Sequence, residues 1–411
     1  MHRYAALLLA MLGSAQAADL PPELPPTAQV AEVLRQSPEV LAAASRREAE
    51  AAQQQRLEAG PHEWTIRMGS QQRRSAPAAL SSERYQEWNA TLERPWRLPG
   101  KAVVDARLGA SGVALAETAY QDALHEGSRE LLRTWFAWLR ETAVARQWTA
   151  EVDALSRQAS ATGRRQRLGD ASQLDTLLAE AALARAEAQR QQATARQKAA
   201  EEDLRLRFPG LTLREPAQAG EPETPAGDEA TWISDLLTHS HELRLARGEA
   251  EQLALQAERL RADRLPDPSV GLSYSRERSG EEQVVGAFVS IPLPGTARRA
   301  TADAGLAQAE AARRRAQGIE RRVASAAAAL YHGARAGVAS WQAADDAARR
   351  LEQGASLIAR AQALGEGSLN EVLNARRLAN EARLAAVVAR LDALELGARL
   401  RLDAHRLWDF D

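Results

Sequence analysis

The spacing of hydrophobic residues changes from a helical period to a period of two and back again, twice along the chain. Residues 28–59 are rich in Ala, Leu, Glu, Gln and Arg, which predicts a helix, with Ser37-Pro38 marking a start or a kink. Apolar and polar residues then alternate over about 63–70 and about 85–96. This alternation predicts two strands, each with one apolar and one polar face.

The second half shows the same alternation over about 269–276 and 283–292. Each strand pair is followed by Leu-Pro-Gly and then by a proline-free stretch of helical composition, at 101–167 and 296–363. At 1.5 Å per residue, such a helix is about 100 Å long. Helices of this length, far above the usual dozen residues, predict packing in a coiled coil or a helical barrel.

A short glycine-containing turn ends each long helix and leads into a further helix, at 171–208 and 367–408. Leu168-Gly169-Asp170-Ala171-Ser172 resembles Leu364-Gly365-Glu366-Gly367-Ser368, about 195 residues later. That period is far longer than the repeats of solenoid proteins. We therefore expect one duplicated domain.

The duplication sets the expected domain boundaries. The first repeat covers 28–208, with the helical hairpin 101–208, and the second covers 229–411, with the hairpin 296–408. Residues 209–228 are rich in Pro, Gly and acidic residues, which predicts a linker or equatorial segment.

The first 17 residues have the pattern of a secretory signal peptide. A short cationic start precedes an apolar run from Tyr4 to Leu12, and Ala15-Gln16-Ala17 is a cleavage signal of the A-x-A kind. The alternative is a buried N-terminal helix. The apolar run is too short to span a bilayer, and no later segment has the roughly 18 unbroken apolar residues that a transmembrane helix needs. The sequence predicts an exported protein that is soluble, peripheral or a β-barrel.

Composition and charge exclude several classes of function. The chain has no cysteine, which excludes disulfide scaffolds, thiolate metal sites, cysteine nucleophiles and N-terminal lipidation through a cysteine. Its 53 basic and 55 acidic residues give no electrostatic footprint for nucleic acid. No catalytic motif or phosphate-binding loop is visible, so we expect neither an enzyme nor a cofactor.

The histidines give little indication of a metal site. His239 and His241 are the only close pair, and at i and i+2 of a helix they point to different faces. We therefore expect a structural or capping role for them.

The four predicted strands need a partner for their apolar face. A soluble protein would pack that face on a helix. Strands of this length can instead cross an outer membrane at a tilt, with the polar face lining a lumen. Aromatic residues are scarce in the chain yet cluster around these strands, as in the interfacial bands of membrane barrels: Trp64, Tyr85, Trp88, Trp96, Tyr274 and Phe288.

A sheet in lipid must close on itself, and four strands cannot do so. Several chains must therefore contribute strands to one barrel. Two chains would give eight strands with a filled interior, whereas three or more would leave room for a channel.

The order of these features resembles the TolC-like outer membrane efflux proteins over essentially the whole mature chain. Ser-Pro-Glu-Val-Leu (37–41) and Glu-Arg-Pro-Trp-Arg-Leu-Pro-Gly-Lys (93–101) resemble the branch that serves heavy-metal cation efflux. The resemblance implies a mainly helical homotrimer. Four strands from each chain would form a twelve-stranded barrel in outer membrane lipid, continuous with a periplasmic α-helical barrel. It also implies two partners, a periplasmic adaptor protein and an inner membrane RND-type pump.

The two hairpin turns are the strongest local signals. Gly169 and Gly365 suit the left-handed conformation that ends a helix, and Ser172 and Ser368 can cap the next one. Ordinary helix hairpins would need the same residues. The resemblance adds that these turns, with Leu168 and Leu364, form the periplasmic tip that docks the adaptor.

The resemblance also implies a gate at the periplasmic end of the channel. Asp175 and Glu371 lie six residues after the two turn glycines, and three copies of each would form acidic rings that favour cations. Asn374 stands where some relatives have a second acid, and Gly367 replaces a possible basic partner. For each carboxylate alone, a solvated helix face is an equally good interpretation.

The sequence is compatible with two classes of function. The first is an exit duct, carrying heavy-metal cations or alternatively serving multidrug efflux or type I protein secretion. The second is a soluble periplasmic helical scaffold or adaptor with conventionally packed strands.

Overall fold

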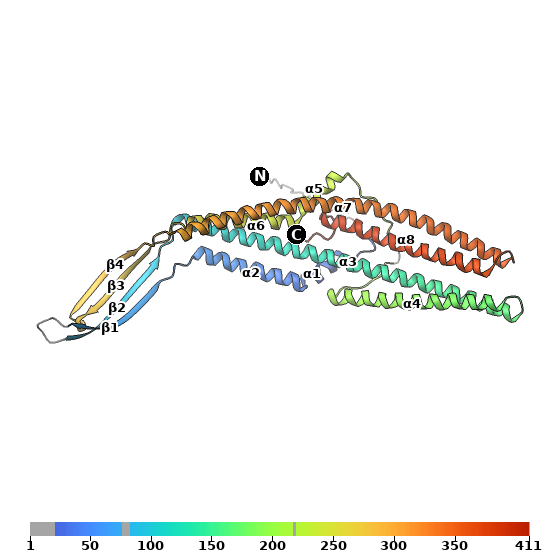
Figure 1. Ribbon diagram of the computed structural model, residues 1–411, viewed down its shortest axis with the longest axis horizontal. Coiled ribbons are helices and arrows are strands. Elements are labelled where there is room, and N and C mark those ends of the chain that lie inside the picture. The colour runs from blue at the N-terminus through green and yellow to red at the C-terminus, as the bar shows by residue number, and fades with distance from the viewer. Residues whose placement is uncertain (1–20, 76–82, 217–218, 411) are drawn as a thin grey trace, which may run out of the picture. The chain divides into compact units, whose positions relative to one another are not determined.

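The structure is a computed structural model that describes residues 21–75, 83–216 and 219–410. The predicted signal peptide (1–17) lies outside the described residues. Figure 1 shows long helices and one small sheet. The first half of the chain contains α1 (Thr27–Arg35), α2 (Pro38–Ala59), β1 (Thr65–Ser75), β2 (Glu83–Pro95), α3 (Pro99–Arg167) and α4 (Gln173–Arg207).

The second half repeats this order, with one 3-10 turn added between its strands. It contains α5 (Glu229–His239), α6 (His241–Ala262), β3 (Ser269–Glu277), η1 (Arg278–Gly280), β4 (Glu282–Ser290), α7 (Thr296–Ala363) and α8 (Leu369–Asp403). The described residues of 209–228 contain no helix or strand.

The helix predicted over 28–59 is divided in two at Ser37-Pro38. Ser37 accepts a hydrogen bond on Oγ from the backbone N–H of Val40 (3.4 Å), and Pro38 occupies the first turn of α2. Ser240 does the same at the start of α6, where its Oγ accepts from the N–H of Leu243 (3.2 Å). Proline at the first helical position loses no hydrogen bond, so Ser-Pro here begins a helix.

The last helix ends at Asp403, five residues before the predicted end at 408. His405 has a φ of 55°, a left-handed conformation that cannot continue a right-handed helix. The N–H of Arg406 donates to the carbonyl of Arg401 (2.8 Å), and the N–H of His405 donates to that of Leu402 (3.0 Å). This pair of bonds is the usual helix-ending motif, with a histidine in the place of the usual glycine.

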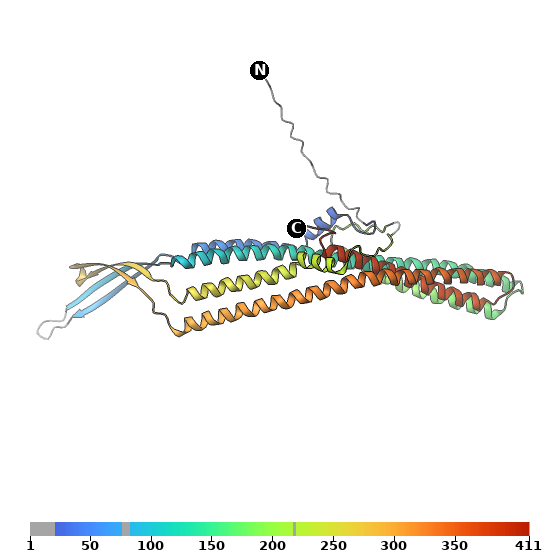
Figure 2. The ribbon, with the colours of Figure 1, turned by 90° about the horizontal axis from the view of Figure 1, so that it is seen from above.

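The four strands form one antiparallel sheet in the order β1-β2-β3-β4. Ile66 pairs with Leu92, Leu92 with Leu272, and Leu272 with Ala287, so the register aligns the apolar positions of all four strands. Figure 2 shows the twist of the sheet. Strands β1 and β4 are its two edges, with no further strand paired to either among the described residues.

The chain falls into two compact units that do not coincide with the sequence halves. The first unit contains the described residues up to Val33 with Leu131–Thr224 and Ala334–Ala398. The second contains Leu34–Glu130, Pro225–Gly333 and the residues from Arg399 onward. Each unit takes segments from both halves, because the long helices α3 and α7 pass from one unit into the other.

In the first unit, α3, α4 and α8 share an apolar core. Val152 and Leu155 of α3 pack with Ala186 of α4, and Leu373 of α8 lies against this cluster. Nearer the N-terminal end of this part of α3, the indole N–H of Trp135 donates to the carbonyl of Glu23 (2.7 Å).

In the second unit, α3 lies between α2 and α6, and α6 packs on α7. Gly109 of α3 is so close to α2 that an added Cβ would lie 3.0 Å from the Cα of Gln54. Gly305 of α7 similarly faces Leu260 of α6. The glycines within the long helices therefore fall into two groups. Gly109 permits close packing, whereas Gly333 has no neighbouring atom within 4 Å of its Cβ position. None of the described helices is both long and apolar enough to cross a membrane.

Candidate functional site

One face of the sheet is apolar and exposed. The paired positions Met68, Ala90, Tyr274 and Val285 cross all four strands on this face. The side chain of Val285 is 77% exposed and that of Met68 is 74% exposed. Leu92 on this face is half-buried, and other exposed apolar side chains continue the face: Ile66, Val270, Leu272 and Val289. A contiguous apolar surface of this kind requires a partner or a membrane.

The opposite face of the sheet carries paired charges. Glu87 is buried beneath Arg73, whose guanidinium lies 3.2 Å from Glu87 Oε1 and 3.3 Å from Glu277 Oε2. Gln71 donates to Glu87 Oε2 (2.9 Å), and Arg67 lies 3.4 Å from Glu93. A polar face laced with charge suits a water-filled space.

The register divides the predicted aromatic band between the two faces. Trp88 and Tyr274 lie together on the apolar face, with ring centroids 5.3 Å apart. Trp64 and Trp96, directly outside β1 and β2, are exposed and continue the same alternation. Tyr85 pairs with Arg73, and Phe288 pairs with Gly271 on the polar face. These two rings therefore lie on the opposite face from Trp88 and Tyr274, and the membrane aromatic band stays a prediction.

The Leu-Pro-Gly-Lys segment holds a buried ion network that the sequence did not indicate. Lys101 is almost fully buried, and its Nζ lies 3.0 Å from Asp263 and 2.9 Å from Asp267. Asp105, one turn further along α3, forms ion pairs with Arg97 (Nη1 to Oδ2, 3.3 Å) and Arg259 (Nε to Oδ1, 2.5 Å). The burial of Asp263 and Asp267 by itself raises their pKa values, but the hydrogen bonds from Arg259 and Lys101 respectively reverse this and leave both pKa values lowered. These charges fix the start of α3 against the end of α6.

The two hairpin turns share one geometry. Gly169 and Gly365 have φ of 82° and 88°, as predicted. The N–H of Asp170 donates to the carbonyl of Arg165 (2.8 Å), and the N–H of Glu366 donates to that of Ala361 (2.9 Å). These are six-residue helix-ending bonds that require a left-handed residue between them. The leucines before the glycines, Leu168 and Leu364, are 84% and 80% exposed.

The predicted capping serines act together with the two carboxylates assigned to the gate. Ser172 Oγ accepts from the N–H of Asp175 (3.0 Å), while Asp175 Oδ2 accepts from the N–H of Ser172 (3.1 Å). Ser368 and Glu371 form the same reciprocal pair at 3.2 and 2.8 Å. Each pair satisfies two backbone donors at the start of the returning helix.

This arrangement gives each carboxylate a local role. The hydrogen bond from the Ser172 side chain lowers the pKa of Asp175, and the backbone N–H of Ser368 lowers that of Glu371. Asn374, one turn beyond Glu371, accepts from Arg377 (3.0 Å). Within the protomer these three residues make helix-capping and helix-surface contacts, and a role in a gate stays a prediction.

Four histidines from three segments that are distant in sequence meet in the second unit. His125 of α3, His241 at the start of α6 and His405 after α8 have ring centroids 5.1–5.3 Å apart. His239, the last residue of α5, stacks on His405 at 4.9 Å. The sequence indicated only the pair His239 and His241, because the cluster is built by tertiary contacts between segments more than a hundred residues apart.

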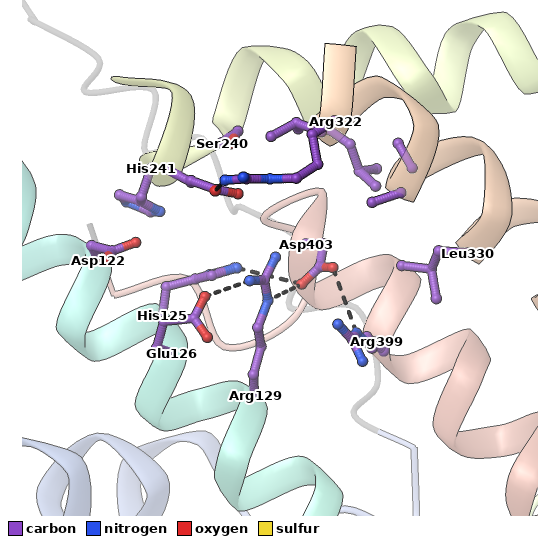
Figure 3. A pocket seen from close by; sticks show the side chains of 15 residues that line it. Asp122, His125, Glu126, Arg129, Ser240, His241, Arg322, Leu330, Arg399 and Asp403 are labelled. Carbon is purple, nitrogen blue, oxygen red and sulfur yellow. Dashed lines mark hydrogen bonds and ion pairs between the residues drawn. The ribbon is translucent and has the colours of Figure 1, made fainter. Parts of the chain in front are cut away.

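His125 and His241 line a cavity of about 280 Å³ that is bordered by α3, α6, α7 and α8. Figure 3 shows Asp403 at its edge, held by His125, Arg129 and Arg399. Across the cavity, Arg322 of α7 is paired with Glu242 of α6. The cavity is lined by both charged and apolar side chains, and the described residues that line it contain no arrangement of nucleophile and base.

The fold is similar to those of solved outer membrane channels. The outer membrane protein VceC of Vibrio cholerae matches with a TM-score of 0.73 and 17% identity, over 93% of this chain and 95% of that one. The outer-membrane channel OprN matches with a TM-score of 0.78 and 16% identity, over 93% and 90%. The open state of the MtrE outer membrane channel of Neisseria gonorrhoeae matches with a TM-score of 0.68 and 17% identity, over 94% and 90%.

Neither the protein-family models nor the curated proteins gave a match to this sequence. The structural similarity confirms the predicted fold class, which is mainly helical with a four-stranded antiparallel sheet. The chain has the TolC-like outer membrane channel fold. The similarity extends over several channels at 13–17% identity and does not single out a branch.

Proposed function

We propose that this protein is the outer membrane exit duct of a tripartite efflux system and catalyses no reaction. Three copies of the chain would form a twelve-stranded barrel in the outer membrane, and their helices would extend through the periplasm. The duct would receive its cargo from an inner membrane RND-type pump through a periplasmic adaptor protein.

The sheet is the observation that carries this proposal. Its apolar face is exposed, and both of its edge strands have free backbone groups on their outer sides among the described residues. In lipid every such group must be hydrogen-bonded, so β4 of one copy would have to pair with β1 of the next. Three sheets of four strands close a ring wide enough for a water-filled lumen.

The hairpin turns support a role in docking the adaptor. Leu168 and Leu364 are exposed apolar side chains on rigid, capped turns. Neither Gly169 nor Gly365 has an atom within 4 Å of its Cβ position, so a partner can approach the backbone closely. Exposed apolar groups on a preorganised turn suit the helical hairpins of an adaptor.

For the cargo we propose heavy-metal cations. The support is the resemblance of residues 37–41 and 93–101 to the heavy-metal branch of the TolC-like proteins. In the structure these residues cap α2 and build the ion network around Lys101, so they support the scaffold and do not contact cargo. A deletion strain should become sensitive to heavy-metal cations. Sensitivity only to organic drugs, or a defect in protein secretion, would contradict this cargo.

Disulfide cross-linking of the native protein tests barrel closure, because the chain contains no cysteine. We would combine Met68→Cys in β1 with single cysteines at alternate β4 positions, namely Gln283, Val285, Ala287 or Val289. Within one chain, β1 and β4 are separated by two strands and lie roughly 14 Å apart, beyond the reach of a disulfide. At least one of these pairs should give covalent trimers under oxidising conditions in membranes.

The matched control is Met68→Cys with Ala90→Cys, which are directly paired neighbours in β1 and β2. This pair should form an intrachain disulfide and leave the monomer band unchanged. Recovery of the protein in the soluble periplasmic fraction, with only monomers for every β4 position, would contradict the duct and favour a soluble periplasmic scaffold.

A further inference from the structure

We propose that His125, His241 and His405 bind a resident divalent transition-metal ion, with Zn²⁺ as the expected ion. This site is distinct from the transported cargo and does not depend on the proposed duct function. All three residues belong to the second compact unit, so the site is formed within one unit of one chain.

The three rings converge closely enough for one ion. One ring nitrogen from each histidine lies within 4.8 Å of the other two. In a tetrahedral site with Zn–N bonds of about 2.0–2.1 Å, ligand nitrogens are about 3.4 Å apart and imidazole centroids about 5.2 Å apart. The observed centroid distances of 5.1–5.3 Å match the latter value, and binding would have to bring the ring nitrogens from within 4.8 Å to about 3.4 Å of one another.

Carboxylates orient two of the three rings as in known metal sites. His125 Nε2 lies 3.4 Å from Asp403 Oδ1, and His405 Nδ1 lies 3.2 Å from Asp409 Oδ1. A neutral imidazole that donates from one nitrogen keeps its lone pair on the other. Metal-binding histidines almost always have such a second partner, which fixes the tautomer and raises the basicity of the ligand nitrogen.

The charges around the histidines are compatible with a cation. Four carboxylates line the adjoining cavity, from Asp122, Glu126, Glu242 and Asp403, against three guanidiniums, from Arg129, Arg322 and Arg399. Burial and the nearby carboxylate of Glu126 raise the pKa of Asp122 above its ordinary value.

The remaining charged groups facing the cluster are paired with each other. Arg406 bonds to Asp235. His239 Nδ1 is 2.9 Å from the carbonyl of Asp235, which leaves His239 beside the site as a neighbour of His405. The cavity of about 280 Å³ next to the cluster has room for a water molecule as the fourth ligand.

The burial of the three histidines indicates that the ion stays bound to the protein and is not a transported ion. The side chains of His125 and His405 are 11% and 8% exposed, and His241 is 3% exposed. Permeation requires weak binding at an accessible site, whereas three buried imidazoles bind a transition metal tightly. The ion would fasten the C-terminal segment and the α5–α6 junction to α3, and it would stabilise the folded state.

The test uses the full-length protein in detergent without a polyhistidine tag, stripped of metal by a chelator. Titration with Zn²⁺ should show one ion bound per chain and should raise the melting temperature. Co²⁺ should give the intense visible absorption of a tetrahedral site with nitrogen ligands. His125→Gln or His405→Gln should lower the Zn²⁺ affinity at least ~100-fold, and Asp409→Asn about 10–100-fold, as for other carboxylates that orient a ligand.

His332→Gln is the matched control, because His332 is exposed and pairs only with Glu229 among the interactions described for its ring nitrogens. It should leave Zn²⁺ binding unchanged. Failure of the wild-type protein to bind Zn²⁺ would overturn the proposal, as would unchanged affinity in the His125 and His405 variants. An equal loss in the His332 variant would show that the ion binds to scattered surface histidines. None of these outcomes bears on whether the protein is a duct.

Discussion

At the scale of single residues, the carboxylate of Asp403 interacts with three basic side chains in the second unit. This carboxylate is buried, and its oxygens lie 2.7 Å from a nitrogen of Arg129, 3.4 Å from one of His125 and 3.8 Å from one of Arg399. Burial by itself raises the pKa of Asp403, but the hydrogen bond from His125 and the charge of Arg129 outweigh it and leave the pKa below its ordinary value. The ionised form is therefore the one that stabilises the end of α8.

This pKa shift predicts a pH dependence. A carboxyl with a lowered pKa in the folded state contributes stability that is present above its unfolded pKa, about 3.9, and is lost as the pH falls through the lower folded value. Amide hydrogen exchange should show increased local opening of residues 399–406 below about pH 4. Asp403→Asn should weaken this segment by ~1–3 kcal/mol at neutral pH, because Arg129 loses its charged partner at the end of α8 and keeps only Glu126 of its own helix. It should also remove most of the acid dependence, and an unchanged acid dependence would contradict this assignment.

Alanine substitutions at two glycines of the long helices should change the stability of the protein in opposite directions. Gly109→Ala puts a methyl group 2.9–3.0 Å from Gln54 and forces α2 away from α3. We expect a loss of ~1–3 kcal/mol. Gly333→Ala meets nothing within 4 Å and should gain up to ~1 kcal/mol from its higher helix propensity. Thermal unfolding of the two variants beside the wild type checks this, and equal effects of both would contradict the packing described for α2.

Residue roles that depend on neighbours in sequence could be predicted, and those that depend on the fold could not. Gly169 and Ser172 were recognisable because helix ends need a left-handed residue and a capping oxygen within a few positions. His125, His241 and His405 carry no such local signature, since α3, the start of α6 and the end of α8 meet only in the folded chain. The partners of Lys101 were hidden for the same reason.

At the scale of elements, the hairpins combine rigidity with exposed apolar side chains. Two capping boxes and two helix-ending motifs hold the turns, so Leu168 and Leu364 are presented at little cost in conformational entropy. The element boundaries were predictable to within a few residues because the hydrophobic period changes sharply at each of them. The largest differences are at the ends of β1 and α8, which end at Ser75 and Asp403 and not at about 70 and 408, and at the end of α8 a left-handed histidine overrides the helical composition.

The proposed adaptor contact makes a prediction at this scale. Leu168→Asp and Leu364→Asp should each reduce by ~10-fold or more the amount of adaptor that co-purifies with the protein from its native membranes, because an apolar anchor becomes a charge. The trimer should remain intact, as judged by its migration without heating. Leu206→Asp is the control, since Leu206 is 77% exposed in the same unit but lies at the far end of α4. If Leu206→Asp were as harmful as the turn variants, docking at the turns would be contradicted.

At the scale of the whole molecule, the two sequence repeats do not coincide with the two compact units of the structure. The element order runs twice, yet each compact unit draws on both halves, because α3 and α7 are long enough to belong to two units. A sequence repeat could therefore predict the order of elements but not which of them pack together. The sheet shows the same principle, since β2 of the first half pairs with β3 of the second.

Arginine substitutions at two adjacent residues of β4 should have different effects, because the two side chains lie on opposite faces of the sheet. Val285 lies on the apolar face and Val284 on the polar face, opposite Tyr274 and Ser275 respectively. If the apolar face contacts lipid, Val285→Arg should destabilise the barrel by ~2–4 kcal/mol near the bilayer midplane and abolish the trimer in the outer membrane. Val284→Arg should leave trimer yield close to that of the wild type. Its charge would then line the lumen, and it should shift the ion selectivity measured in planar bilayers towards anions. Equal trimer yields for the two variants would show that lipid does not distinguish these faces, and the sheet would then have to pack against protein instead.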